Sequence, residues 1–152
     1  LKVGNKLTED NFFENAQSFP LGIIRSDGHY IVRDPIAITD KGELVCVGEL
    51  SNGDNIDILT ATPTDLIESV GMIAHKLAYH TPAIEEDSAV LLIDCISRAL
   101  FLKQDFTKEL DKTVAAFDSK STIFGALVLG EIANSGTGYL EFYNKTAVLA
   151  RL

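Results

Sequence analysis

The sequence predicts a single α+β domain in which a mixed or mostly antiparallel sheet is packed by two or three helices. Two runs of β-branched and aliphatic residues, Val90–Ile93 and Phe124–Leu129, are typical of strands covered on both faces. We expect them to be interior strands that pair with each other. A third stretch, Thr62–Tyr79, opens with a capping threonine and a proline and continues with apolar residues at helical spacing, which predicts the longest helix.

The first sixty residues contain turn signals at short intervals. Thr8, followed by acidic residues, predicts a helix start, and that helix should end before Phe19. Gly42 closes a three-residue loop and Gly53 lies in a second turn, so both should return the chain antiparallel to itself. We therefore expect a meander of short strands at Leu21–Ile24, His29–Thr39, Glu43–Leu50 and Ile56–Thr60.

Two further elements are expected in the second half of the chain. Apolar residues at helical spacing, Phe106, Leu110, Val114 and Phe117, predict an amphipathic helix over roughly Asp105–Phe117. The segment Gly138–Ala150 is expected to form a closing hairpin that turns at Asn144 and Lys145. No internal repeat or change of composition divides the chain, so residues 1–152 should form one domain.

Composition excludes several classes of partner. The 152 residues carry 13 basic and 22 acidic side chains, a net charge of −9, which argues against nucleic acid or an anionic membrane surface. No apolar run reaches the roughly 18 residues of a membrane span. Cys46 and Cys95 lie in apolar stretches, and no spacing typical of metal ligands occurs, so we expect a reducing cytoplasm, no metal and no cofactor. The chain starts at Leu1 and ends in an apolar stretch, and we expect it to be part of a longer protein.

Polar side chains follow both apolar runs. Cys95 and Arg98 come after the first run and Glu131 after the second, which predicts a crevice at the ends of the strands, where open α/β sheets usually hold small ligands. The alternative is that Arg98 and Glu131 form an ion pair that only closes the sheet end. Arg33 lies in a strand-like stretch just before Pro35, which indicates an edge or bulge position, and its side chain is either solvated or reaches the pocket.

These residue types suit recognition of a small polar metabolite. A guanidinium from Arg98 or Arg33 can hold a carboxylate in a bidentate manner, and Glu131 can meet an ammonium, so an amino acid would match the pocket. A cysteine-dependent hydrolase with Cys95 as nucleophile is an alternative, but no histidine is placed by a motif near Cys95. A purely structural assembly domain is a second alternative, and it predicts a large apolar surface patch and no pocket.

An ordered succession of short motifs resembles a known family. The chain is similar to the C-terminal FIST (F-box and intracellular signal transduction) domain from about Leu21 to its end. The motifs are Leu21-Gly22-Ile23, Tyr30-Ile31-Val32-Arg33-Asp34-Pro35, Gly48-Glu49-Leu50 with Gly53-Asp54, Asp94-Cys95-Ile96-Ser97-Arg98, Gly130-Glu131-Ile132 and Asn144-Lys145-Thr146. The resemblance implies a non-enzymatic sensory domain that binds small ligands, with amino acids as the expected ligands.

The resemblance also implies partners and site residues. It places the domain beside an N-terminal FIST domain, in a longer protein coupled to a signalling output domain. It carries Arg33, Cys95, Arg98 and Glu131 onto these positions as candidate ligand-binding residues.

Overall fold

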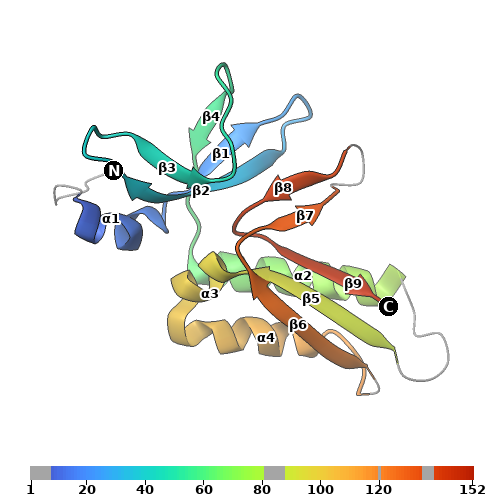
Figure 1. Ribbon diagram of the computed structural model, residues 1–152. Coiled ribbons are helices and arrows are strands. Elements are labelled where there is room, and N and C mark those ends of the chain that lie inside the picture. Colours follow the sequence, from blue (N-terminus) through green and yellow to red (C-terminus); the bar gives the residue numbers. More distant parts are fainter. Residues whose placement is uncertain (1–7, 81–87, 120, 135–138) are drawn as a thin grey trace.

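The computed structural model describes residues 8–80, 88–119, 121–134 and 139–152 and confirms the α+β class (Figure 1). The elements in chain order are α1 (Glu9–Ala16), β1 (Leu21–Ile24), β2 (Tyr30–Ile38), β3 (Leu44–Val47), β4 (Ile56–Ile58), α2 (Pro63–His80), β5 (Ala89–Cys95), α3 (Ile96–Leu102), η1 (Lys103–Asp105), α4 (Phe106–Val114), β6 (Thr122–Val128), β7 (Glu131–Ala133), β8 (Glu141–Tyr143) and β9 (Ala147–Arg151).

The N-terminal half forms the predicted meander. It is an antiparallel sheet of four strands in the order β3-β2-β1-β4, with α1 packed beside β2. Gly42, at a φ of 81°, occupies the left-handed position of the β2–β3 turn, as expected. The register of β2 against β3 shifts between Pro35 and Ala37, which confirms the bulge predicted from the proline.

The C-terminal half is built on a sheet in the order β6-β5-β9, with α2 and α4 along one of its faces (Figure 1). The expected pairing of the two apolar strands is confirmed: β5 and β6 are parallel, from Ala89 opposite Thr122 to Cys95 opposite Val128. Parallel neighbours need a long crossover connection, and α3, η1 and α4 provide it. The predicted longest helix is confirmed as α2, which has 18 residues.

The prediction that both apolar strands are interior is wrong for β6. Because β9 pairs with the other edge of β5, β6 is left at the edge of the three-stranded sheet. Phe124 and Leu127 on β6 are 49% and 46% exposed, whereas Val90 on β5 is fully buried. The central position therefore belongs to β5 alone.

The prediction of a closing hairpin is also wrong. β8 pairs with β7, and β9 pairs antiparallel with β5, so the two strands on either side of Asn144 and Lys145 belong to different sheets. Lys145, at a φ of 56°, redirects the chain between them. Gly138, where we expected the hairpin to begin, lies outside the described residues.

Two helices bring polar residues to the end of β5. The chain enters α3 directly after Cys95, so Arg98 lies in the first turn of a helix. On α4 the buried face carries Glu109 and Thr113, while Leu110 and Val114 of the predicted apolar stripe are exposed. The reason is a buried ion pair between Glu109 and Arg98, which holds the helix with its polar residues inward.

The two halves meet along β2 and the turn after β8. The backbone N–H of Asn144 donates to the carbonyl of Val32 at 3.2 Å. Arg33 on β2 donates to the carbonyl of Phe142 at 2.6 Å and to that of Glu49 at 3.0 Å. This junction places the segment around Lys145 against α2 and α3, next to the buried ion pairs of Arg98.

Candidate functional site

Arg98 is the centre of a buried charged cluster. It is 4% exposed and forms an ion pair with Asp94, which lies in β5 four residues earlier in the chain, at 3.2 Å between Nε and Oδ1. Its Nε and Nη2 donate to the two carboxylate oxygens of Glu109 on α4, and its Nη2 also donates to the carbonyl of Leu66 on α2 at 3.1 Å. Three elements are therefore tied together by one guanidinium.

The cluster holds two carboxyl groups for one arginine. Asp94 and Glu109 are both buried, and Arg98 forms an ion pair with each of them. Burial, followed by the neighbouring Glu109, raises the pKa of Asp94 to about 8, against the opposing charge of Arg98. At neutral pH Asp94 therefore keeps its proton and adds no second negative charge beside Arg98.

A cavity of about 310 Å³ lies beside this cluster. We call it the Arg98 cavity. It is formed where the end of α1, the start of α2, α3 and the turn before β9 meet. Its lining includes Gln17, Asp65, Ser69, Arg98, Phe101 and Lys145. Its volume is at the lower end of the range for small-molecule sites.

Two buried cations line this cavity. Lys145 is held with its Nζ 3.2 Å from Asp34 and 5.7 Å from the centre of the Phe101 ring. The contacts of Arg98 with Glu109, Leu66 and the Lys145 carbonyl use four of its five N–H groups, which leaves one on Nη1. The cavity can therefore offer charge-assisted donors to an anionic group.

Acceptors line the same cavity. The Gln17 Oε1 atom is buried and has no hydrogen-bond partner among the described residues. Asp65 caps α2 by accepting from the N–H and hydroxyl of Thr62, and those bonds, the backbone bond first, hold the pKa of Asp65 below its usual value. An unpartnered buried carbonyl next to an ionised carboxylate suits a cationic group.

Cys95 and Glu131 form a second buried group, separate from the ion pairs of Arg98. Thr146 Oγ1 donates to Glu131, and Cys95 Sγ lies 3.2 Å from Ser97 Oγ. Burial raises the pKa of the Cys95 thiol and of Glu131. Arg98 is thus paired with Asp94 and Glu109 rather than with Glu131, unlike the ion pair considered from the sequence.

Of the four sequence-predicted site residues, only Arg98 lines the Arg98 cavity. Arg33 is taken up by the carbonyls of Glu49 and Phe142, and its guanidinium lies 5.8 Å from the centre of the Phe142 ring. Sequence reasoning missed Glu109 because it lies among other charged residues of a predicted helix. It missed Gln17 because no motif or spacing singles out that residue. Asp94 had a usable signal, a carboxylate next to last in an apolar strand and four residues before an arginine.

A buried cluster of charges beside a cavity is typical of a domain that binds a small ligand. The comparison with known protein families is more specific. The FIST C domain family matches residues 3–134, and this chain belongs to that family. It is accordingly a sensory domain of the signal transduction class. Neither the curated proteins nor the solved structures contain a significant match.

The described residues also bear on two other features, a membrane-spanning helix and a metal site. Among the helices of the part of the chain that the structure describes, none is long and apolar enough to cross a bilayer. Within the same residues no group of three or more histidine, cysteine, aspartate or glutamate side chains is arranged to hold a metal ion.

Proposed function

We propose that this FIST C domain senses a small zwitterionic metabolite, an amino acid, in the Arg98 cavity. One observation carries the proposal: two buried cations, Arg98 and Lys145, line the same cavity as an unpartnered carbonyl oxygen of Gln17. A zwitterion has the two opposite charges that such a lining complements, whereas a simple anion or a simple cation would use only half of it.

In this proposal each side chain has a separate task. The free N–H of Arg98 and the ammonium of Lys145 donate to the ligand carboxylate. Gln17 Oε1 accepts from the ligand ammonium, and Asp65 lowers the electrostatic energy of that cation. Phe101 and Leu66 supply apolar surface for the ligand side chain.

The other predicted residues would act as positioning residues. The N–H of Cys95 donates to the Thr146 carbonyl at 3.1 Å, and Glu131 accepts from the Thr146 hydroxyl, so both fix the residue next to Lys145. Arg33 fixes β8 on the other side of the same turn through Phe142. We propose that Cys95, Glu131 and Arg33 hold Lys145 in place rather than contact the ligand.

A binding domain fits better than the two alternatives. A nucleophilic cysteine needs a lowered pKa and access to substrate, but Cys95 is 1% exposed and burial raises its pKa. A purely structural assembly domain does not need a cavity lined by buried charges. We therefore propose a non-enzymatic sensor.

We further propose that the domain works in the cytoplasm, beside an N-terminal FIST region and a signalling output domain of a longer protein. Two unpaired cysteines, Cys46 and Cys95, support a reducing compartment. Exposed apolar side chains on and around β7, among them Leu129, Ile132 and Leu140, support contact with another domain.

Thermal unfolding in the presence of amino acids tests the binding proposal. A ligand at 100 times its dissociation constant stabilises the folded chain by about 2.7 kcal/mol. For a domain of this size the melting temperature should rise by roughly 5–10 °C. Each amino acid is compared with the carboxylic acid and the amine that lack its second charge, and both should produce a much smaller rise.

The variant Gln17→Leu sharpens the test because it removes one acceptor without touching the charged cluster. It should weaken amino acid binding and leave the small effect of the matching carboxylic acid unchanged. Gln104→Leu, at an exposed residue outside the cavity, is the matched control and should bind as the unaltered chain does. Equal binding of an amino acid by both variants would contradict the assignment of Gln17.

A further inference from the structure

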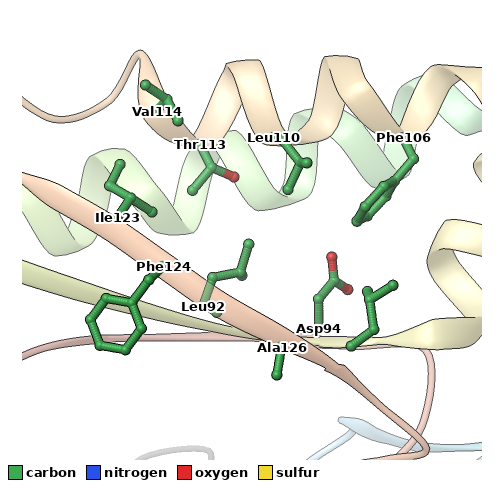
Figure 2. Close-up of a pocket in the computed structure, with 11 residues that line it drawn as sticks. Leu92, Asp94, Phe106, Leu110, Thr113, Val114, Ile123, Phe124 and Ala126 are labelled. Atoms are coloured by element: carbon green, nitrogen blue, oxygen red, sulfur yellow. The ribbon is translucent and has the colours of Figure 1, made fainter.

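A second cavity, of about 350 Å³, lies between α4 and the strands β5 and β6 (Figure 2). We call it the Asp94 cavity. It shares no lining residue with the Arg98 cavity. Its walls are apolar: Leu92, Ile123 and Leu127 from the strands, and Phe106, Leu110 and Val114 from the helix.

One carboxyl group faces this apolar space. Figure 2 shows the Asp94 side chain rising from the strand toward α4, with its oxygen atoms near Phe106 and Leu110. Asp94 is 1% exposed, and neither of its oxygens accepts a hydrogen bond from the described residues. The other polar side chain of the lining, Thr113, donates its hydroxyl to the Glu109 carbonyl and is satisfied.

The charges around Asp94 leave room for one more cation. Arg98 on α3 is paired with both Asp94 and Glu109, and Glu131 on β7 adds a further negative field. The surplus negative charge is avoided because Asp94, whose pKa is raised to about 8, keeps its proton at neutral pH. A ligand ammonium next to Asp94 would take the place of that proton and would let Asp94 ionise.

The cavity is accessible from solvent. Val114 and Leu127 line it from the two sides and are 55% and 46% exposed. A ligand carboxylate in this space would face Asp94 without a cation of its own, because no basic residue among those described lines this cavity and Arg98 lines the other one. The lining therefore selects for an apolar molecule with a single positive charge and against an amino acid.

We propose that the Asp94 cavity binds a small hydrophobic primary amine, with the ammonium on Asp94 and the aliphatic or aromatic group between α4 and β6. Such amines are the chemical class formed when apolar amino acids lose their carboxylate. This site shares none of its described lining residues with the amino acid site proposed above.

Calorimetry with 3-methylbutylamine tests the proposal against two shape-matched compounds, 3-methylbutan-1-ol and 3-methylbutanoate. The amine should bind, the alcohol should bind about 10-fold to 100-fold more weakly for want of a charge-assisted bond, and the carboxylate should give no heat. Measured at pH 7 in buffers of different ionisation enthalpy, amine binding should release up to about one proton. Equal binding of amine and alcohol, or no proton release, would overturn the proposal.

Two variants place the site. Asp94→Asn should abolish amine binding, and because this change could disturb the cluster, Leu110→Trp tests the same cavity from a residue at its rim. Leu110→Trp should fill the space and remove binding while the circular dichroism spectrum stays unchanged. Leu100→Trp, at an exposed leucine of α3 outside the cavity, is the control and should bind normally. Undiminished binding by a folded Leu110→Trp chain would refute this location.

Discussion

Glu109→Gln should change the way the stability of this domain depends on pH. Glu109 is fully buried, forms an ion pair with Arg98 and is one of the groups that raise the pKa of Asp94. The substitution keeps the shape and one acceptor oxygen for Arg98 but removes one of the two carboxyl groups. Asp94 then has the guanidinium to itself, and its pKa should fall.

The sign of the effect in the unaltered chain follows from the proton count. In the folded state the pKa of Asp94 is raised to about 8 from 3.8, so between those values the folded chain binds more protons than the unfolded chain. The free energy of unfolding must therefore decrease as pH rises through this range. The slope is at most about 1.4 kcal/mol per pH unit, or about 3 kcal/mol between pH 5 and pH 7.

Urea unfolding followed by circular dichroism at several pH values from 5 to 8 measures this slope. The unaltered chain should lose stability over the range, and Glu109→Gln should lose much less. Glu131, whose pKa burial also raises, remains in both chains and contributes the same residual slope. Glu68→Gln, at an exposed residue of α2 paired with Lys112, is the control and should keep the full slope. If Glu109→Gln and Glu68→Gln have the same slope, Glu109 does not raise the pKa of Asp94 and the reasoning is refuted.

Three further predictions concern the frame of the site. Arg33→Met should lower the free energy of unfolding by about 1.5–3 kcal/mol, measured in urea, because two backbone carbonyls lose a charged donor. Gly125→Ala should disrupt the pairing of β5 and β6 and reduce the yield of soluble protein, since the added Cβ would lie 2.0 Å from the Leu92 carbonyl oxygen; a normal yield would contradict this. A thiol reagent should label the half-buried Cys46 in the folded chain and leave Cys95 unmodified until urea is added, and rapid labelling of Cys95 would revive the enzyme alternative.

The sequence predicted the parts of the fold that are determined by neighbouring residues. Gly42 and Gly53 occupy left-handed positions that only a few residue types tolerate, so the turns of the N-terminal sheet were readable without any tertiary contact. The same holds for α2, whose capping threonine and proline lie at its start. Local signals of this kind do not depend on what packs against them.

The errors all involve a partner that is distant in sequence. Phe124 was expected to be covered, but the strand that completes the sheet, β9, pairs with β5 instead. The apolar residues of α4 gave no sign that Glu109 is the residue buried most deeply on this helix, because its partner Arg98 lies on α3. An apolar pattern predicts burial only when no buried charge competes for the same face.

The site was predicted only in part for the same reason. Arg98 could be selected because it follows a buried strand, but its neighbours in the cavity come from the end of α1 and the turn before β9. Gln17 and Lys145 are separated from Arg98 by 81 and 47 residues respectively. Nothing in the local sequence of either residue indicates that it reaches the same cavity.

The position of Arg98 gives the two proposed sites a common element. It lines one cavity directly, and its ion pair with Asp94 reaches the wall of the other. An amine on Asp94 would displace the proton of that carboxyl group and leave a carboxylate paired with an ammonium. The charges next to Arg98 would then be redistributed, although no residue that lines its cavity is touched. Because coupling between two sites is reciprocal, an amino acid on Arg98 must alter the affinity for the amine by the same factor. In this cluster of one arginine and two carboxyl groups, the coupling would require only the loss or gain of a proton. It would not require rearrangement of α3 or α4.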